Sequence, residues 1–178
     1  GYFGKWHLGD DPDHHPSAQG FEEAITSMGR HFQFRTNPPT NTPPGAYLAD
    51  YLTDRALEFI ERHRDEPFFL VLAHFAVHTP LEAKPELIER FRSRPPAGGH
   101  ANPTYAAMIL SLDESVGRVI AALDRLNLSS NTLVVFSSDN GGVGGYEREG
   151  LGKNDITDNA PLRHGKGSLY EGGVRVPF

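Results

Sequence analysis

The sequence predicts an α/β protein built around a mostly parallel sheet. Two short runs, residues 68–75 and 132–137, are almost continuously apolar, which is typical of parallel strands that are covered on both faces. Between them, residues 104–126 repeat apolar side chains at steps of three and four, the spacing of one helix face. A strand, a long helix and a second strand form a crossover unit, so we expect the two strands to be parallel.

The remaining elements follow from the same periodicities and from helix-breaking residues. Pro67 ends one helical pattern, and the run NPPTNTPP at residues 37–44 cannot be helical. The expected elements are a strand at 21–25, helices at 46–63 and 85–91, and loops across most of 9–45 and at 93–103.

The composition argues against several classes of protein. The chain has 178 residues, the size of one ordinary domain, and its 19 glycines and 14 prolines indicate a loop-rich globular protein. No apolar run approaches the roughly 18 residues of a membrane-spanning helix. A net charge of −6 without a basic cluster argues against nucleic acid as a partner. The lack of cysteine excludes a disulfide framework or a thiolate metal site within these residues.

Polar residues follow both of the apolar runs. Ligands of parallel sheets bind beyond the carboxyl ends of the strands, so we expect His78 and the pair Asp139–Asn140 at the same edge. A carboxylate beside an amide oxygen is a hard ligand pair for Ca²⁺ or Mg²⁺, although Asp-Asn-Gly-Gly is equally good chemistry for an ordinary turn. Because Ca²⁺ takes about six to eight oxygens, its other ligands would have to come from outside these residues.

Histidines and lysines supply the candidate cations. His78 suits a general acid or an anion contact, or simple loop packing, whereas His74 is expected to be a buried histidine with its hydrogen bonds satisfied. In the run Gly-Lys-Trp-His-Leu-Gly at 4–9, an extended chain would place Lys5 and His7 on one face and the tryptophan on the other. Lys166 lies between two glycines that leave its ammonium unobstructed. A surface strand and a solvated loop lysine are the alternatives for these two segments.

The order of these motifs is more specific than any one of them. Gly-Lys-Trp-His-Leu-Gly, His-Thr-Pro-Leu, Ser-Asp-Asn-Gly-Gly and Gly-Lys-Gly-Ser-Leu-Tyr-Glu-Gly-Gly-Val-Arg-Val-Pro, in this order, resemble the sulfatase family along the whole chain. The resemblance implies an alkaline-phosphatase-like, layered α/β/α sandwich, with residues 1–178 as the central part of a single catalytic domain that is truncated at both ends. It also implies hydrolysis of sulfate monoesters with Ca²⁺, rather than Mg²⁺, and a formylglycine nucleophile.

The resemblance assigns a role to each candidate residue. It places Asp139 and Asn140 on the metal ion, Lys5 near the metal and the sulfate, and Lys166 on the sulfate oxygens. Such positive charges can stabilise the sulfuryl group during its transfer.

The two candidate histidines take the remaining roles that the resemblance implies. It places His7 at the hydroxyl of the nucleophile and His78 at the leaving-group oxygen. Proton donation by His78 would spare the leaving group from departing as a free anion.

The nucleophile of the family derives from a Cys or Ser in a Cys-x-Pro-x-Arg type of motif. These residues contain no cysteine and no such motif, which fits an internal fragment that is inactive alone. For the full-length protein the resemblance implies a formylglycine-generating or equivalent maturation enzyme, a small-molecule or carbohydrate sulfate ester as substrate, and a periplasmic, secreted or lysosomal location.

Two alternatives remain open at this point. The first is a hydrolase of phosphomonoesters, phosphodiesters or phosphonates from the same superfamily, because its metal chemistry would be similar. The second is a non-catalytic, calcium-dependent binding module, because the nucleophile cannot be checked within these residues.

Overall fold

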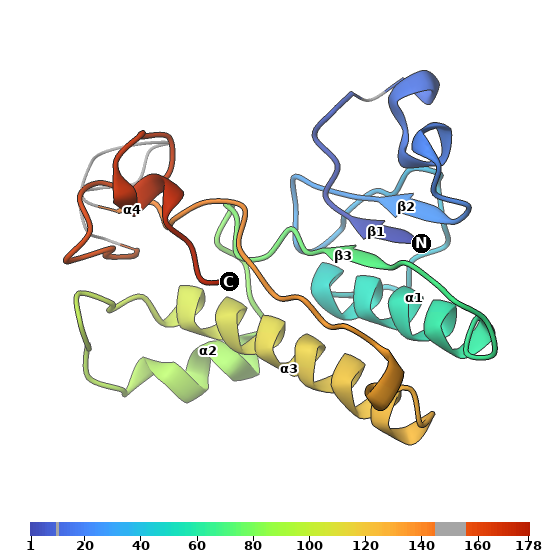
Figure 1. Ribbon diagram of the computed structural model, residues 1–178. Coiled ribbons are helices and arrows are strands. Elements are labelled where there is room, and N and C mark those ends of the chain that lie inside the picture. The colour runs from blue at the N-terminus through green and yellow to red at the C-terminus, as the bar shows by residue number, and fades with distance from the viewer. Residues whose placement is uncertain (10, 145–155) are drawn as a thin grey trace. The chain divides into compact units, whose positions relative to one another are not determined.

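The computed structural model describes residues 1–9, 11–144 and 156–178 (Figure 1). The chain divides into two compact units. The first comprises Gly1–Ile88 and Thr104–Thr132, and the second comprises Glu89–Pro103 and Leu133–Phe178. Within the described ranges, no helix is long and apolar enough to cross a membrane.

A three-stranded parallel sheet forms the centre of the first unit. Its strands are β1 (Tyr2–Gly4), β2 (Ala24–Thr26) and β3 (Val71–Ala73), in the order β2-β1-β3. Both pairings are parallel, and the last residue of β1 lies opposite the last residues of β2 and β3. All three carboxyl ends therefore lie at one edge, which confirms the parallel arrangement expected for an α/β protein. The strand expected at 21–25 is shifted toward the C-terminus.

Helix α1 (Leu48–Arg62) covers this sheet and confirms the helix predicted at 46–63. Its apolar face packs against β1 and β3. Leu52 and Ala56 are fully buried there, together with Phe3 from β1. Burial of such side chains is the main favourable term for this small layer.

The helix predicted at 104–126 is α3 (Pro103–Arg125), and the one predicted at 85–91 is α2 (Pro85–Arg92). The buried face of α3 differs from the periodic apolar face that predicted it. Ile109 and Ile120 are 46% and 39% exposed, whereas Ser111 and Ser115 are buried. Small side chains at these positions leave room for polar contacts with neighbouring elements.

Ser115 joins a buried chain of hydrogen bonds across the first unit. The Thr53 hydroxyl donates to the Ala49 carbonyl (2.7 Å) and lies 2.6 Å from the Ser115 hydroxyl, which lies 2.7 Å from Nε2 of His74. Because the Thr53 proton is already engaged, Ser115 donates to Thr53, and His74 donates its Nε2–H to Ser115. Among the residues that the structure describes, the buried Nδ1 of His74 has no hydrogen-bond partner. This arrangement selects the neutral imidazole. His74 is hydrogen-bonded as expected, but it is half-buried and only one of its two ring nitrogens is satisfied within this part of the chain.

The predicted strand at 132–137 is wrong. Within the described residues this segment pairs with no strand, and its apolar side chains are exposed: Leu133 by 89%, Val135 by 61% and Phe136 by 59%. The crossover pairing expected for it with 68–75 is therefore absent from the described sheet. An apolar run shows that side chains need cover, but a strand forms only where a partner backbone is present.

The strand predicted at 68–75 is only partly confirmed. It is parallel, but it is limited to the three residues of β3, which are half-buried, and Phe69 is 71% exposed. Full cover on both faces was the wrong expectation for these residues. β3 is also an edge of the described sheet, with one neighbouring strand.

The desolvated ring of His74 predicts a loss of stability in acid. Burial lowers the pKa of His74 from its ordinary value of 6.5 to about 4. Between these values the unfolded chain binds a proton that the folded chain excludes, so the free energy of unfolding should fall as pH drops from 6.5 toward 4. The stability that His74 contributes is fully present above the pKa of His74 in the unfolded chain. Its loss in acid amounts to about 3 kcal/mol at most.

Urea unfolding at pH 7 and pH 4.5 measures this effect against a His74→Gln variant, which retains a hydrogen-bond donor but does not titrate. Carboxylates titrate in the same range, so the difference between variant and parent isolates His74. The exposed His100→Gln serves as control. An identical pH dependence of parent and His74→Gln would show that His74 is not the responsible group.

Candidate active site

Lys5 is placed by a close contact between β1 and β3. The backbone N–H of Lys5 donates to the Ala73 carbonyl at 2.7 Å. Gly4 has a φ of +136°, and a Cβ added to it would lie 1.8 Å from the same carbonyl oxygen. Only glycine permits this approach, so Gly4 fixes the point at which Lys5 leaves the carboxyl end of β1.

Phe75 brings Lys5 and His78 together. The Lys5 ammonium nitrogen lies 6.0 Å from the centroid of the Phe75 ring. The His78 ring stacks on Phe75 with a centroid distance of 5.0 Å and an interplanar angle of 27°. Phe75 is itself buried. Two of the predicted site residues thus contact one aromatic ring at the same edge of the sheet.

The hydrogen bonds of His78 define its tautomer. Its Nδ1 lies 2.7 Å from the Thr79 carbonyl oxygen, which can only accept, so Nδ1 carries a proton. The backbone N–H of His78 donates to the Phe75 carbonyl at 2.9 Å. A second, transferable proton would therefore reside on Nε2.

His31 is a structural partner of His78 that the sequence did not reveal. It is fully buried, and its Nε2–H donates to the His78 carbonyl at 2.8 Å. Its ring lies between Tyr47 and Phe75, with centroid distances of 5.8 and 4.8 Å. Burial lowers the pKa of His31. A row of four rings in contact, Tyr47, His31, Phe75 and His78, thus supports the loop after β3.

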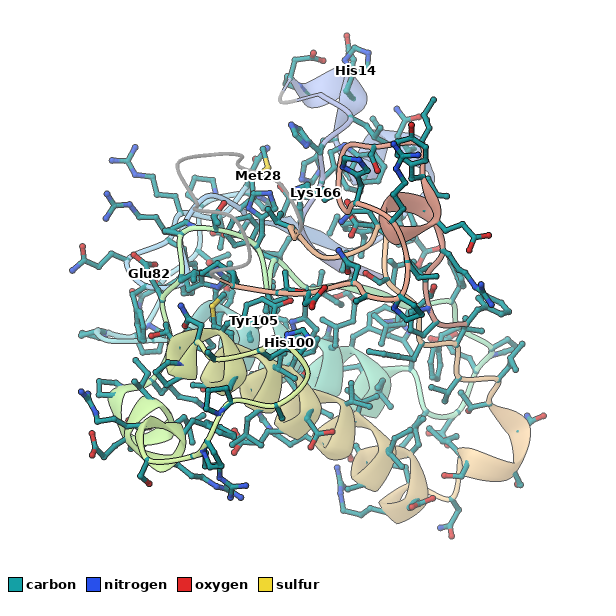
Figure 2. The ribbon with its side chains drawn as sticks, turned by 90° about the vertical axis from the view of Figure 1, so that its left-hand side faces the viewer. His14, Met28, Glu82, His100, Tyr105 and Lys166 are labelled. Carbon is teal, nitrogen blue, oxygen red and sulfur yellow. The ribbon has the colours of Figure 1, made fainter. Side chains whose placement is uncertain are left out.

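His31 is further tied to the segment that follows His78. The backbone N–H of His31 donates to Oε2 of Glu82, which lies in this segment and is labelled in Figure 2, at 2.9 Å. The two histidines are 47 residues apart in the sequence. A loop histidine far from the motif carries no local signal, so periodicity could not have identified it.

Trp6 and His7 occupy different surroundings from Lys5. The Trp6 indole donates to the His14 carbonyl at 2.8 Å and meets the edge of Tyr2 at 5.0 Å. His7 is exposed, and within the described part of the chain no hydrogen bond or ring contact joins it to Lys5 or His78. Lys5 and the indole contact different partners. The shared face of Lys5 and His7, and the role of His7, stay predictions.

In the second unit, two glycine-rich motifs interlock through their backbones. The Lys166 N–H donates to the Gly142 carbonyl, and the Gly141 N–H donates to the Gly173 carbonyl, both at 3.0 Å. A Cβ at Gly141 would lie 1.8 Å from the Gly172 carbonyl oxygen, and one at Gly165 would lie 2.2 Å from that of Gly142. The glycines are therefore required by backbone contact, whereas the sequence suggested that they leave the lysine unobstructed.

This interlock brings the backbone of Lys166 next to the segment that carries the predicted metal ligands. Lys166, labelled in Figure 2, lies in the loop before α4 (Glu171–Val174). Its backbone is bonded to Gly142, two residues beyond Asn140. Asp139 is exposed and Asn140 is half-buried. The second unit thus brings together the segments that carry three of the six candidates.

Asp139 and Asn140 fit part of a calcium site by their donor chemistry. The Asn140 amide nitrogen donates to the Gly141 carbonyl at 2.9 Å, which leaves its Oδ1 and the Asp139 carboxylate as hard oxygen donors. Among the described residues, no group of three or more His, Cys, Asp or Glu side chains could hold a metal ion. Two ligand residues fall short of the about six to eight oxygens that Ca²⁺ requires.

The first unit also contains a cavity that differs from the candidate site. Its volume is about 420 Å³, and its lining includes Tyr47, Asp50 and Lys84 but none of the six candidate residues. Lys84 is engaged by Asp50 and Glu114 at 3.2 Å each.

The expected meeting of His78 and Asp139 at one sheet edge remains a prediction. Among the described residues, Asp139 does not follow a strand.

Comparison with known proteins decides the family. A family model described as Sulfatase matches residues 1–178. The chain belongs to the sulfatase family. It is 33% identical to the N-acetylgalactosamine-6-sulfatase of Mus musculus over 98% of this chain and 35% of that protein. It is 39% identical to the N-acetylgalactosamine-6-O-sulfatase of Bacteroides thetaiotaomicron over 74% of this chain and 24% of that protein.

Solved structures agree with this assignment. The crystal structure of Ps i-CgsB in complex with k-i-k-neocarrahexaose matches 99% of this chain and 43% of that chain, with a TM-score of 0.82 and 35% identity. The likeness confirms the alkaline-phosphatase-like α/β fold class. The sulfatase chain described here spans about a third of the length of the mouse relative and about a quarter of the bacterial one.

The interlocked glycines predict a sharp intolerance to a single methyl group. Gly165→Ala would drive a Cβ into the Gly142 carbonyl, and we expect a loss of about 1–3 kcal/mol in the free energy of unfolding. Gly117→Ala on α3 is the matched control, because no atom of the described residues lies within 4 Å of its Cβ. That helix position should gain about 1 kcal/mol. Urea unfolding of both variants measures the contrast, and equal effects would contradict the interlock.

Proposed function

We propose that the complete protein hydrolyses sulfate monoesters and that the six candidate residues belong to its active site. The observation that carries this proposal is the meeting of the Lys5 ammonium and the His78 imidazole at Phe75, beyond the carboxyl ends of β1 and β3. A cation beside a proton donor suits a reaction in which an anionic group is transferred and charge develops on the leaving oxygen.

His78 is proposed as the general acid. Hydrolysis of a sulfate monoester breaks the bond between sulfur and the leaving oxygen, adds the elements of water, and yields an alcohol and hydrogen sulfate. The departing oxygen needs a proton. The Thr79 carbonyl engages Nδ1–H of His78, so Nε2 of the imidazolium is the atom that would deliver it.

The lysines and His7 are proposed to act on the sulfuryl group and the nucleophile. Lys5 and Lys166 would balance negative charge on the sulfuryl oxygens. Their backbones are held by the Ala73 and Gly142 carbonyls, so little of the chain has to reorganise around the substrate. His7, which is exposed, would contact the hydroxyl of the nucleophile.

A calcium ion and a formylglycine nucleophile complete the proposed active site. Asp139 and Asn140 would hold Ca²⁺ together with ligands beyond these residues, and a maturation enzyme would make formylglycine from a Cys or Ser that is also beyond them. When bound, the metal would polarise a sulfuryl oxygen, and the formylglycine would supply the attacking hydroxyl. The described residues bind and orient the sulfate ester and donate the proton.

The names of the relatives support a proposal for the substrate class. Two of them are named as sulfatases of N-acetylgalactosamine 6-sulfate, and a structural neighbour is solved with a neocarrahexaose. We propose a carbohydrate sulfate as substrate of the complete protein. Its location is proposed to be an exported or lysosomal compartment, as expected for enzymes that act on such sugars.

Replacement of His78 by Ala should harm poor leaving groups more than good ones. The aryl oxide of an activated aryl sulfate can leave without a proton, whereas the alkoxide of an alkyl or sugar sulfate needs one. In the complete protein we expect kcat/KM to fall about 10²–10⁴-fold for the sugar sulfate and much less for the aryl sulfate. Steady-state kinetics with both esters measures this, and His100→Ala is the control. Equal losses would rule out the acid role, and preferred turnover of phosphate esters would favour the related phosphohydrolase.

Replacement of Asp139 by Ala should abolish retention of calcium. The variant loses a charged oxygen ligand, and the exposed Asp113→Ala on α3 removes the same charge elsewhere. Elemental analysis of the complete proteins after dialysis gives the metal content directly. We expect stoichiometric calcium in the parent and in Asp113→Ala, and little in Asp139→Ala. Unchanged calcium in Asp139→Ala would refute this ligand assignment.

A further inference from the structure

We propose that Asn159 is a positioning residue that sets the spacing between the metal-ligand segment 139–142 and the segment 164–166 that carries Lys166. The inference rests on the proposed function, because it assigns meaning to the distance between these two segments. It concerns only the second unit, in which both segments and Asn159 lie.

The side-chain amide of Asn159 joins both segments at once. Its Oδ1 accepts the N–H of Gly142 at 3.2 Å, and its Nδ2 donates to the carbonyl of the same residue at 2.8 Å. This pair of bonds imitates the pairing of two strand residues. Nδ2 also donates to the His164 carbonyl at 3.1 Å. One side chain therefore fixes a residue after the metal ligands and a residue before Lys166.

The surroundings of the amide are built to fit it. A Cβ on Gly165 would lie 2.6 Å from the Asn159 Nδ2, and a Cβ on Gly142 would lie 3.2 Å from its Oδ1. On another side, Thr157 is buried, and its Oγ1 would lie 2.6 Å from the same Gly142 Cβ. The glycines of both motifs thus make room for this amide as well as for each other.

Gly142 is the point at which the two segments meet. Its carbonyl accepts from the Asn159 amide and from the Lys166 backbone N–H, the latter at 3.0 Å. Since Asn140 is two residues earlier, a shift of Gly142 would displace the metal ligands and Lys166 together. Loss of Asn159 should therefore impair metal binding and sulfate binding in parallel, although its side chain is placed on neither ligand.

The chemistry at this position specifies an amide. Nδ2 faces two carbonyl oxygens, so it must donate, while Oδ1 faces an N–H, so it must accept. Asn159→Asp retains the shape but turns the donor into an anionic oxygen facing two carbonyl oxygens. Asn131→Asp is the matched control, because it makes the same chemical change at an exposed residue of the 3₁₀ turn after α3.

The experiment compares parent, Asn159→Asp and Asn131→Asp as complete proteins. Calcium affinity is measured by titration of the calcium-depleted proteins, KM and kcat with a sulfate ester at saturating calcium, and folding by circular dichroism and urea unfolding. We expect Asn159→Asp to bind calcium at least tenfold more weakly. At saturating calcium its KM should stay raised at least fivefold, because Lys166 remains displaced. Asn131→Asp should match the parent.

The outcomes separate positioning from simple stability. A folded Asn159→Asp protein with parental calcium affinity and KM overturns the proposal, even if its unfolding midpoint is lowered. If Asn159→Asp does not fold, Asn159→Ser, which retains one hydroxyl donor, is judged by the same two constants. If the parent hydrolyses no sulfate ester, the proposed function fails, while the calcium titration still decides whether Asn159 positions the metal ligands.

Discussion

The Lys5 amide reaches the Ala73 carbonyl across a gap that has no room for a Cβ on Gly4, and the same constraint recurs where Gly141 and Gly165 meet carbonyls of the facing motif. Contact between backbones at glycines thus determines where each candidate segment lies. A hydrogen bond between main-chain groups is short and has no rotamers, so it holds its neighbours more tightly than a long side chain can. These bonds fix the point at which each lysine side chain leaves the backbone.

The contacts made by the charged side chains are weaker. A cation at an exposed site contributes about 0.5–1 kcal/mol when it lies within about 6 Å of an aromatic ring centroid. The Lys5 ammonium lies at that limit, 6.0 Å from the centroid of Phe75. The surface ion pair between Arg125 and Glu61, on α3 and α1, is in the same low range. The fold therefore depends on packed apolar side chains and backbone bonds, and the charged groups of the candidate site are held in place without being needed for folding.

Local periodicity predicted the elements that depend on it. Helix α1 and helix α3 each begin and end within two residues of their predicted bounds. The segment 132–137 was mistaken for a strand because its apolar residues are visible in the local sequence. Strand pairing depends on a distant partner segment, which the local sequence does not reveal. The exposure of Ile109 on α3 has a related cause, since Ser115 faces Thr53 and His74 instead. A polar network within a core leaves no trace in a hydropathy pattern.

The candidate site shows the same division. Lys5, His78 and Lys166 were found because they lie inside motifs whose order is specific, and the structure places the first two on one ring. The residues that hold them were missed, since His31 is 47 residues from His78 and Asn159 is 17 from Gly142. Phe75 was counted only as part of an apolar strand. Sequence motifs reveal groups that do chemistry, whereas the groups that position them become visible only when distant segments meet.

The surroundings of Lys5 explain how an acidic chain can offer a positive site. The chain carries a net charge of −6, and several cations of the first unit are neutralised by carboxylates: Lys84 by Asp50 and Glu114, and Arg125 by Glu61. Lys5 instead lies near the face of Phe75, which attracts a cation but carries no net charge to cancel it. Burial lowers the pKa of His31 beneath the loop of His78, and the Glu82 carboxylate accepts the His31 backbone N–H. The local field at this edge of the sheet, rather than the total charge, therefore determines what can bind there.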